Sequence, residues 1–400
     1  MFSETRRQTI ADLLRRTARR VPHKVAIHCG GVVWNYSELE ALCDRLAAGL
    51  AAHGVAQGRP CRVLARNSHA FAALRFALAR QAALQGTEVA QFIALPGVGI
   101  DEPADDMLSF ARLDGSTAAL PSLELTGGDL VQIVYISGTE SLPKGAMLTH
   151  EAVQWQHVSC IVEGEMSADD LGLHSLPLYH CAQLDCFLGP GIYLGTTNII
   201  TSVLAHDNLL PLIARHRITP FFAPPTVWIA LLRSPLFDQT DLGSLREGYY
   251  GASIMPVEVM KEIQRRLPQI RLWNFSGQTE IAPLATVLKP ADQLRKPGSA
   301  GKPVLHIEPG RWMTRCATSW LARSARSCTA RPNSWADIST IRSAPAQRSS
   351  VANCVEARPG GRFCCKRIAP LRIGLVDALA KERHFNAEAA ITPHVASILD

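Results

Sequence analysis

A short loop rich in hydroxyl groups is the part of this sequence best suited to chemistry. A run at residues 130–136 that is apolar except for Gln132 leads into Ser-Gly-Thr-Glu-Ser-Leu-Pro-Lys-Gly at residues 137–145. The backbone N–H groups of such a loop can turn toward an anion, and its hydroxyl and ammonium donors suit a triphosphate. Those donors belong to Ser137, Thr139, Ser141 and Lys144. The loop is not a Walker A motif, because Lys144 is followed by glycine and the glycine spacing differs. An ordinary surface turn is the alternative.

Two further positions have side chains that suit a phosphate-handling site. The Glu280 carboxylate is a hard oxygen ligand of the kind that Mg²⁺ prefers, with a solvated surface glutamate as the alternative. His180 can line a substrate tunnel or serve as a hydrogen-bonded structural histidine. A zinc site is a weak interpretation, because the spacing of the nearby candidate ligands matches no standard site. Those ligands are His174, His180, Cys181 and Cys186.

The loop closely resembles the phosphate-binding signature of the adenylate-forming superfamily. That superfamily includes acyl-CoA synthetases, aryl-CoA ligases, luciferases and the adenylation domains of peptide synthetases. Three more segments resemble its motifs and follow in the same order, at residues 176–180, 251–256 and 274–280. Four ordered motifs arise by accident far less often than one. The likeness covers most of residues 1–308 and implies an α/β fold of several subdomains, in which mixed sheets are flanked by helices.

This resemblance implies a role for each matching residue. The nucleotide is expected to contact Ser137, Gly138, Thr139, Glu140, Ser141, Lys144, Gly251, Ala252, Ser253, Ser276, Gly277, Gln278 and Thr279. Thr279 is expected to hydrogen-bond the α-phosphate, and Glu280 to hold magnesium. His180 is expected beside the acyl pocket. Lys144, His180, Thr279 and Glu280 together form the predicted catalytic group.

The family joins a carboxylic acid to ATP, giving acyl-AMP and pyrophosphate, and a thiol, usually coenzyme A, then displaces AMP. The resemblance therefore implies ATP, Mg²⁺ and coenzyme A as cofactors, with a fatty acid as the expected substrate. The first step brings two anions together, so the protein must position them and screen their charge. Lys144, the loop amides and magnesium on Glu280 are suited to that screening.

The sequence departs from the family pattern in three places. Ser276 stands where the family has an aromatic residue that packs on adenine, which predicts weaker ATP affinity. The interval from Asn67 to Tyr135 is short, which suggests a deletion or a local slip of reading frame within residues 80–100. The likeness ends near residue 308. The aspartate that holds the ribose, the hinge, and the small C-terminal domain with its catalytic lysine are therefore expected to be missing.

Residues 311–370 have an unusual composition. They contain ten arginines, five cysteines and three tryptophans, but only Asp337 and Glu356 as acids. Their apolar residues follow neither a helical nor a strand period. We interpret residues 309–370 as an aberrant segment read out of the ancestral frame and expect it to be disordered. Residues 371–400 have helical character and no assigned role.

Regular elements that can hold these motifs in place are indicated along residues 9–308. A helix capped by Thr9 is followed by a hairpin with strands at 24–28 and 32–34. A capping box at residues 37–40 opens a second helix that buries Leu39, Leu42, Leu46 and Leu50. Later segments alternate between strand and helix, which indicates a sheet covered by helices. The predicted segments are strands at 198–201 and 220–223 and helices at 209–216 and 257–267.

Composition sets limits on the class of protein. Hydrophobic residues make up 47% and charged residues 19% of the chain, as in soluble globular proteins. No apolar run reaches the length of a membrane helix, and the N-terminus is polar, so a cytoplasmic location without a transmembrane segment is expected. The eleven scattered cysteines are expected to be reduced thiols. The oligomeric state is not predicted.

Three functions compete at this point. The leading one is ATP-dependent activation of a carboxylic acid and transfer to coenzyme A. The alternative is a non-catalytic remnant or weak nucleotide-binding module of the same family, which would bind ATP·Mg²⁺ without forming acyl-CoA. A nucleic-acid binder is disfavoured, because the net charge of +6 comes largely from residues 311–367, which carry no aromatic–basic binding motif.

Overall fold

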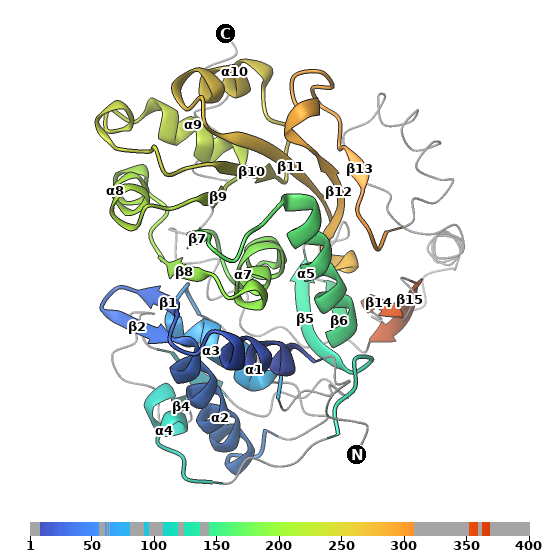
Figure 1. The fold of residues 1–400 in the computed structure, drawn as a ribbon. Coiled ribbons are helices and arrows are strands. Elements are labelled where there is room, and N and C mark those ends of the chain that lie inside the picture. Colours follow the sequence, from blue (N-terminus) through green and yellow to red (C-terminus); the bar gives the residue numbers. More distant parts are fainter. Residues whose placement is uncertain are drawn as a thin grey trace, which may run out of the picture.

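A mixed nine-stranded sheet forms the centre of the computed structural model, in the order β13-β12-β11-β10-β9-β7-β8-β1-β2 (Figure 1). The structure describes residues 9–55, 61, 63, 65–80, 92–95, 107–118, 124–136, 144–307, 352–358 and 362–368. The sheet contains β1 (Val25–Cys29), β2 (Val32–Asn35), β7 (Leu171–His174), β8 (Thr197–Ile200), β9 (Pro220–Phe222), β10 (Glu247–Gly251), β11 (Arg271–Gly277), β12 (Leu284–Leu288) and β13 (Lys302–Pro303). Strands β1, β8, β7, β9, β10 and β11 are parallel. The expected α/β fold with a mixed sheet is therefore confirmed.

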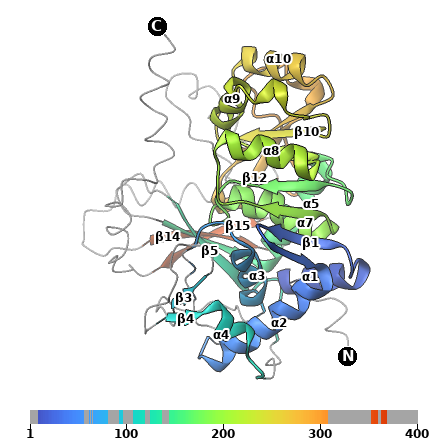
Figure 2. The same cartoon turned by 90° about the vertical axis from the view of Figure 1, so that its left-hand side faces the viewer.

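Helices cover both faces of this sheet (Figure 2). One face packs on α8 (His206–His216), α9 (Pro225–Arg233) and α10 (Val257–Arg266). The other packs on α5 (His150–Gly164) and the π-helix η2 (Leu184–Leu188). These two apolar layers fix the sheet, so the loops at its edge start from rigid supports.

A further helical layer lies beside β1 and β2. It consists of α1 (Ile10–Arg20), α2 (Tyr36–Ala52), α3 (His69–Leu78) and α4 (Phe110–Asp114). Helix α7 (Gly189–Leu194) packs against α1 of this layer. Short elements complete the chain: α6 (Cys181–Gln183), η3 (Phe237–Gln239), η4 (Thr279–Ile281) and η5 (Pro290–Asp292). Three strand pairs lie outside the main sheet: β3 (Phe92–Ala94) with β4 (Met107–Ser109), β5 (Leu130–Ile136) with β6 (Lys144–Thr149), and β14 (Ala352–Arg358) with β15 (Arg362–Ile368).

The first helix begins where the sequence predicts. The Thr9 side chain accepts a hydrogen bond from the Asp12 backbone N–H at 3.1 Å, which satisfies one of the free donors of the first turn. Ile10, Leu13 and Leu14 are all buried. The predicted hairpin also forms, with β1 antiparallel to β2.

The cap of the second helix differs from the prediction. A capping box at Ser37 was expected, but Asn35 is the N-cap. Its side chain accepts from the Glu38 N–H, while the Glu38 carboxylate accepts from the Asn35 N–H, both at 2.8 Å. The reason is that β2 runs to Asn35, so the helix begins at once with Tyr36. The leucine face of α2 is buried as predicted.

The later alternation of strands and helices is confirmed, with ends shifted by at most three residues. The largest shift is in α8, which begins at His206 rather than at residue 209. Most of residues 80–100 and of the segment 309–370 lie outside the described residues. Within the part of the chain that the structure describes, no helix is long and apolar enough to cross a membrane.

Candidate active site

The order of the strands indicates where a ligand can bind. From β7 the chain passes to β8 on one side of β7, and it later returns to β9 on the other side. Such a switch in direction leaves a crevice outside the carboxyl ends of the parallel strands. The segments that leave β7, β9, β10 and β11 therefore converge at one edge, which we call the carboxyl edge. The motifs after residues 174, 251 and 277 begin there.

The ends of β10 and β11 approach neighbouring backbone closely at two glycines. Gly251 is the register partner of Phe275, and a Cβ on Gly251 would lie 2.4 Å from the Phe275 carbonyl oxygen. A Cβ on Gly277 would lie only 1.9 Å from the Pro283 oxygen. No side chain fits at either position, because the backbone of the neighbouring segment fills the space. Ala252, with a positive φ of 66°, and Ser253 are exposed beside these glycines.

The turn that follows β11 presents Thr279 and Glu280. The Gln278 N–H donates to the Pro283 oxygen at 2.8 Å, which closes the turn around η4. Thr279 is buried, with its hydroxyl 3.2 Å from the Cys181 thiol. Burial raises the pKa of that thiol to about 12, so it stays protonated at neutral pH and acts as a weak hydrogen-bonding neighbour. Glu280 is partly exposed.

The loop after β7 places His180 at the same edge. Its Nδ1 accepts a hydrogen bond from the Ala182 N–H at 3.1 Å and so caps α6. Surrounding protein lowers the pKa of the imidazole by desolvation, although part of the ring reaches solvent. The ring is therefore neutral at pH 7. Because Nδ1 is the acceptor, Nε2 carries the proton and can donate to a ligand.

The two strands that flank the predicted phosphate loop, β5 and β6, are described by the structure. Ser137, Gly138, Thr139, Glu140 and Ser141 lie outside the described residues. The strands on either side of the loop pair antiparallel, with Ile136 opposite Lys144. Strand β6, which begins with Lys144, lies against η4, which contains Thr279 and Glu280. The strand that follows the predicted loop therefore packs beside the turn that carries the predicted magnesium ligand.

The donor set suits a magnesium ion that is shared with a nucleotide. Among the described residues, no group of three His, Cys, Asp or Glu side chains comes together. A single carboxylate such as Glu280 is sufficient when phosphates and waters supply the other ligands. The zinc interpretation fails at His174. Its Nε2 lies 2.9 Å from the Asn198 amide oxygen and its Nδ1 lies 2.8 Å from the Gln183 amide nitrogen, so both ring nitrogens are already paired.

Two residues that contact the predicted site segments were not given this position from the sequence. Asn67 holds the loop that leads to His180: its Nδ2 donates to the Leu176 oxygen at 2.7 Å, and its Oδ1 accepts from the Leu178 N–H at 2.8 Å. Cys181 touches Thr279. The local sequence carried a signal only for Asn67, as a polar residue just before the helix cap Ser68.

The sheet, its helical cover and the carboxyl edge define the class as a layered α/β protein with a mixed sheet whose parallel strands end at one edge. More particularly, the chain belongs to the AMP-binding enzyme family, whose profile matches residues 14–85 and 93–309. The resemblance to adenylate-forming enzymes is thereby confirmed, and the family match ends one residue beyond the predicted limit of 308.

Similar proteins include several acid–CoA ligases. Indoleacetate–CoA ligase from Aromatoleum aromaticum is 31% identical over 334 residues, which cover 74% of this chain and 65% of that protein. Feruloyl-CoA synthase from an Amycolatopsis species is 31% identical over 311 residues, covering 72% and 63% respectively. The chain thus spans slightly less than two thirds of these relatives.

Solved structures show the same fold. The N-terminal domain of FACL13 from Mycobacterium tuberculosis superposes with a TM-score of 0.67 at 25% identity, covering 76% of this chain and 85% of that domain. A fatty acyl CoA synthetase from the same organism also gives a TM-score of 0.67 at 25% identity, covering 76% and 66%.

Proposed function

We propose that this chain binds ATP, Mg²⁺ and a carboxylic acid at the carboxyl edge, as the adenylate-forming core of an acid–CoA ligase. The single observation that supports this is convergence. The glycine turns at Gly251 and Gly277, the turn with Thr279 and Glu280, and the His180 loop lie at one edge, and strand β6 contacts η4 of that turn. These segments are far apart in the sequence, so local folding alone does not bring them together.

The proposed chemistry assigns each group a physical task. The exposed turn at Ala252 and Ser253 would receive the base, and the Thr279 hydroxyl would donate to a phosphate. The proton on Nε2 of the neutral His180 would orient the acid carboxylate without adding charge. Lys144 and the loop amides would stabilise negative charge as it shifts to pyrophosphate. Magnesium held by Glu280 would supply additional charge screening for the phosphates.

For the substrate we propose an aromatic carboxylic acid, with fatty acids as the second class. The 31% identical relatives are named for indoleacetate and ferulate, whereas a fatty acyl CoA synthetase is among the similar structures at 25% identity. The fatty acid expected from the sequence therefore stays a prediction. Coenzyme A is proposed as the acceptor on the family relationship alone.

The second candidate is nucleotide binding without turnover. It is favoured by one observation: the family match ends at residue 309, while the chain continues to residue 400. The aspartate, hinge and catalytic lysine expected of the family have no counterpart that we identify in residues 310–400.

Two measurements on the full chain separate these candidates. Titration calorimetry with ATP and Mg²⁺ tests binding, and we expect a measurable but weak affinity for ATP·Mg²⁺. Pyrophosphate release with a panel of aromatic and fatty acids tests activation. Binding without release supports the nucleotide-binding module, and release with any acid supports the ligase core. No binding of ATP at millimolar concentration contradicts both.

A further inference from the structure

One polar side chain interrupts the apolar run of β5. Gln132 is half-buried, and the pairing of β5 with β6 shifts by one residue between Leu130 and Gln132. Such a bulge re-aims a side chain and is common beside functional sites. The strand ends at Ile136, directly before the predicted phosphate loop. The contacts of Gln132 therefore bear on how the support of that loop is held.

The partner of Gln132 is a carboxylate from a distant segment. Its Nε2 donates to Oδ2 of Asp185 at 2.7 Å. Asp185 belongs to η2 and is only 1% exposed, so this carboxylate lies inside the protein. The guanidinium of Arg75 in α3 lies 3.6 Å from the other oxygen, Asp185 Oδ1. Asp185 thus joins β5, α3 and η2, which are far apart in the sequence.

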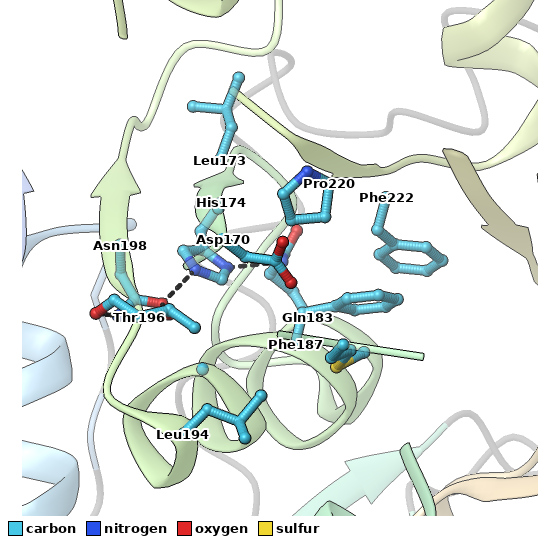
Figure 3. Close-up of a pocket in the computed structure, with 13 residues that line it drawn as sticks. Asp170, Leu173, His174, Gln183, Phe187, Leu194, Thr196, Asn198, Pro220 and Phe222 are labelled. Atoms are coloured by element: carbon cyan, nitrogen blue, oxygen red, sulfur yellow. Dashed lines mark hydrogen bonds between the residues drawn. The ribbon is translucent and has the colours of Figure 1, made fainter. Parts of the chain in front are cut away.

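The segment that carries Asp185 is itself fastened to the main sheet. Gln183, two positions earlier, accepts through Oε1 from the Leu176 N–H at 3.3 Å, and its Nε2 lies 2.8 Å from His174 Nδ1. Figure 3 shows the contact between His174 and Gln183 as a dashed line, beside a small cavity. His180 caps the short helix α6, which runs directly into η2. Asp185 therefore has a fixed place relative to His180.

Stability alone does not account for this buried pair of charges. Desolvation offsets much of the attraction between two buried charges, so apolar residues of similar volume often stabilise a core equally well. Burial raises the pKa of Asp185, and the charge of Arg75 acts in the opposite direction. A carboxylate acceptor does fix the position of its donor, because charge-assisted hydrogen bonds are short and strong. The arrangement is therefore suited to holding Gln132, and β5 with it, in one position.

We propose that Asp185 is a positioning residue, which acts through Gln132 to set β5 relative to the His180 loop. Strand β5 pairs with β6, and β6 packs against η4, the turn with Thr279 and Glu280. A displaced β5 would therefore shift the supports of the phosphate loop against the groups proposed to bind the acid and magnesium. The inference rests on the proposed function, because it takes the β5–β6 pair to present donors to the phosphates of ATP.

The test compares ATP·Mg²⁺ with AMP, which lacks the β- and γ-phosphates. Both ligands are titrated by calorimetry into the full chain and into Gln132→Met, which removes the donor but keeps the length of the side chain. We expect the affinity for ATP·Mg²⁺ to fall about fivefold and that for AMP to stay within about twofold, in the range of changes that act through a contact network. A merely structural role would leave the ratio of the two affinities unchanged.

Further variants separate positioning from general damage to the core. Gln132→Asn is one methylene too short to reach Asp185 and should change the ratio in the same way, even if Gln132→Met does not fold. Asp185→Asn keeps an oxygen that can accept from Gln132, so the ratio should stay near that of the wild type, although Arg75 loses its counter-charge. Thr219→Val is the matched control, because it removes a hydroxyl donor from the buried Asp170 carboxylate at the opposite, amino ends of β7 and β9. It should leave the ratio unchanged.

The outcomes distinguish this inference from the proposed function. An unchanged ratio in both Gln132 variants, or an equal change of ratio in Thr219→Val, would overturn the inference and leave the proposed function standing. Failure of the wild-type chain to bind ATP·Mg²⁺ at millimolar concentration would overturn the proposed function, and this inference with it.

Discussion

At the ends of β10 and β11 the carboxyl edge is lined by backbone, whereas the loop that follows β7 is held in place by side chains. The glycine side has no room for even one added carbon, since the carbonyl oxygens of Phe275 and Pro283 already fill that space. The loop side depends on Asn67, which reaches from the segment before α3 to bond the backbone on both sides of Pro177. The two sides meet where the Cys181 thiol lies 3.2 Å from the Thr279 hydroxyl.

This difference indicates that the two sides respond differently to amino-acid substitutions. A backbone surface fails when an atom is added, because neighbouring main chain cannot move aside cheaply. A loop fastened by an amide fails when atoms are removed, because buried N–H and C=O groups then lose their partners. The predictions below test the two sides separately, beginning with the largest expected effect.

The glycine side should show the largest loss of stability. Gly277→Ala places a methyl group against the Pro283 oxygen and the Ala285 nitrogen, and we expect a loss of about 3 kcal/mol in the free energy of unfolding, the upper range for overpacking. Urea denaturation followed by circular dichroism measures this. Gly31→Ala is the matched control, because nothing lies within 4 Å of its added carbon. Equal midpoints for the two variants would show that the turn relaxes freely.

The loop side should respond to a deletion. Asn67→Ala leaves the Leu178 N–H without its partner and removes the bonds to the Leu176 and Thr201 oxygens. We expect a loss of about 2 kcal/mol in the free energy of unfolding. Asn208→Ala, which removes more exposed bonds to Thr201 and Val203, should cost clearly less. A larger effect at Asn208 would mean that the loop is fastened elsewhere.

A third test concerns His157, a buried histidine in α5, which packs on the same face of the sheet as η2. Burial and then the charge of Arg75 lower the pKa of His157 to about 3 from 6.5, and within the described residues neither ring nitrogen has a hydrogen-bond partner. Between pH 6.5 and about pH 3, His157 binds a proton in the unfolded chain but not in the folded one. The free energy of unfolding therefore decreases as the pH falls below 6.5. His157→Leu should remove about 1.4 kcal/mol of this loss at pH 5.5 and little at pH 8.

The measurement is urea unfolding of the wild type and His157→Leu across this pH range. The comparison is needed because Asp170, Asp185 and Glu247 have pKa values raised by burial. Those carboxyl groups bind protons more readily in the folded chain and act with the opposite sign. If the two unfolding free energies run parallel from pH 8 to pH 5.5, His157 is protonated or solvated in the folded state.

The smallest expected effect concerns ligand binding. Lys144→Ala removes the cation at the start of β6, which lies against the turn with Glu280. We expect ATP·Mg²⁺ affinity to fall by about fivefold, or about 1 kcal/mol, since the backbone donors remain. Lys261→Ala, which removes an exposed cation paired with Glu258 on α10, is the control. An unchanged calorimetric affinity for Lys144→Ala would take this residue out of the site.

Local elements were predictable to different degrees, for physical reasons. The strand at 130–136 was predicted with its observed ends because it is apolar except for Gln132 and is followed by Ser-Gly. The leucine spacing predicted the buried face of α2 correctly, because a helical period depends only on near neighbours. The cap of that helix was mistaken, because both Asn35 and Ser37 are good cap residues. The end of β2 decides between them.

The sequence by itself determined the alternation of strands and helices, the order of the four motifs and therefore the family, since each depends on residues close together in the chain. Only the tertiary structure decided which motifs touch. The hydrogen bonds from Asn67 to the loop and from Cys181 to Thr279 join residues about one hundred positions apart. Such contacts follow from the order of the parallel strands. That order is set by how whole helices and sheets bury their apolar faces against one another, which no local pattern encodes.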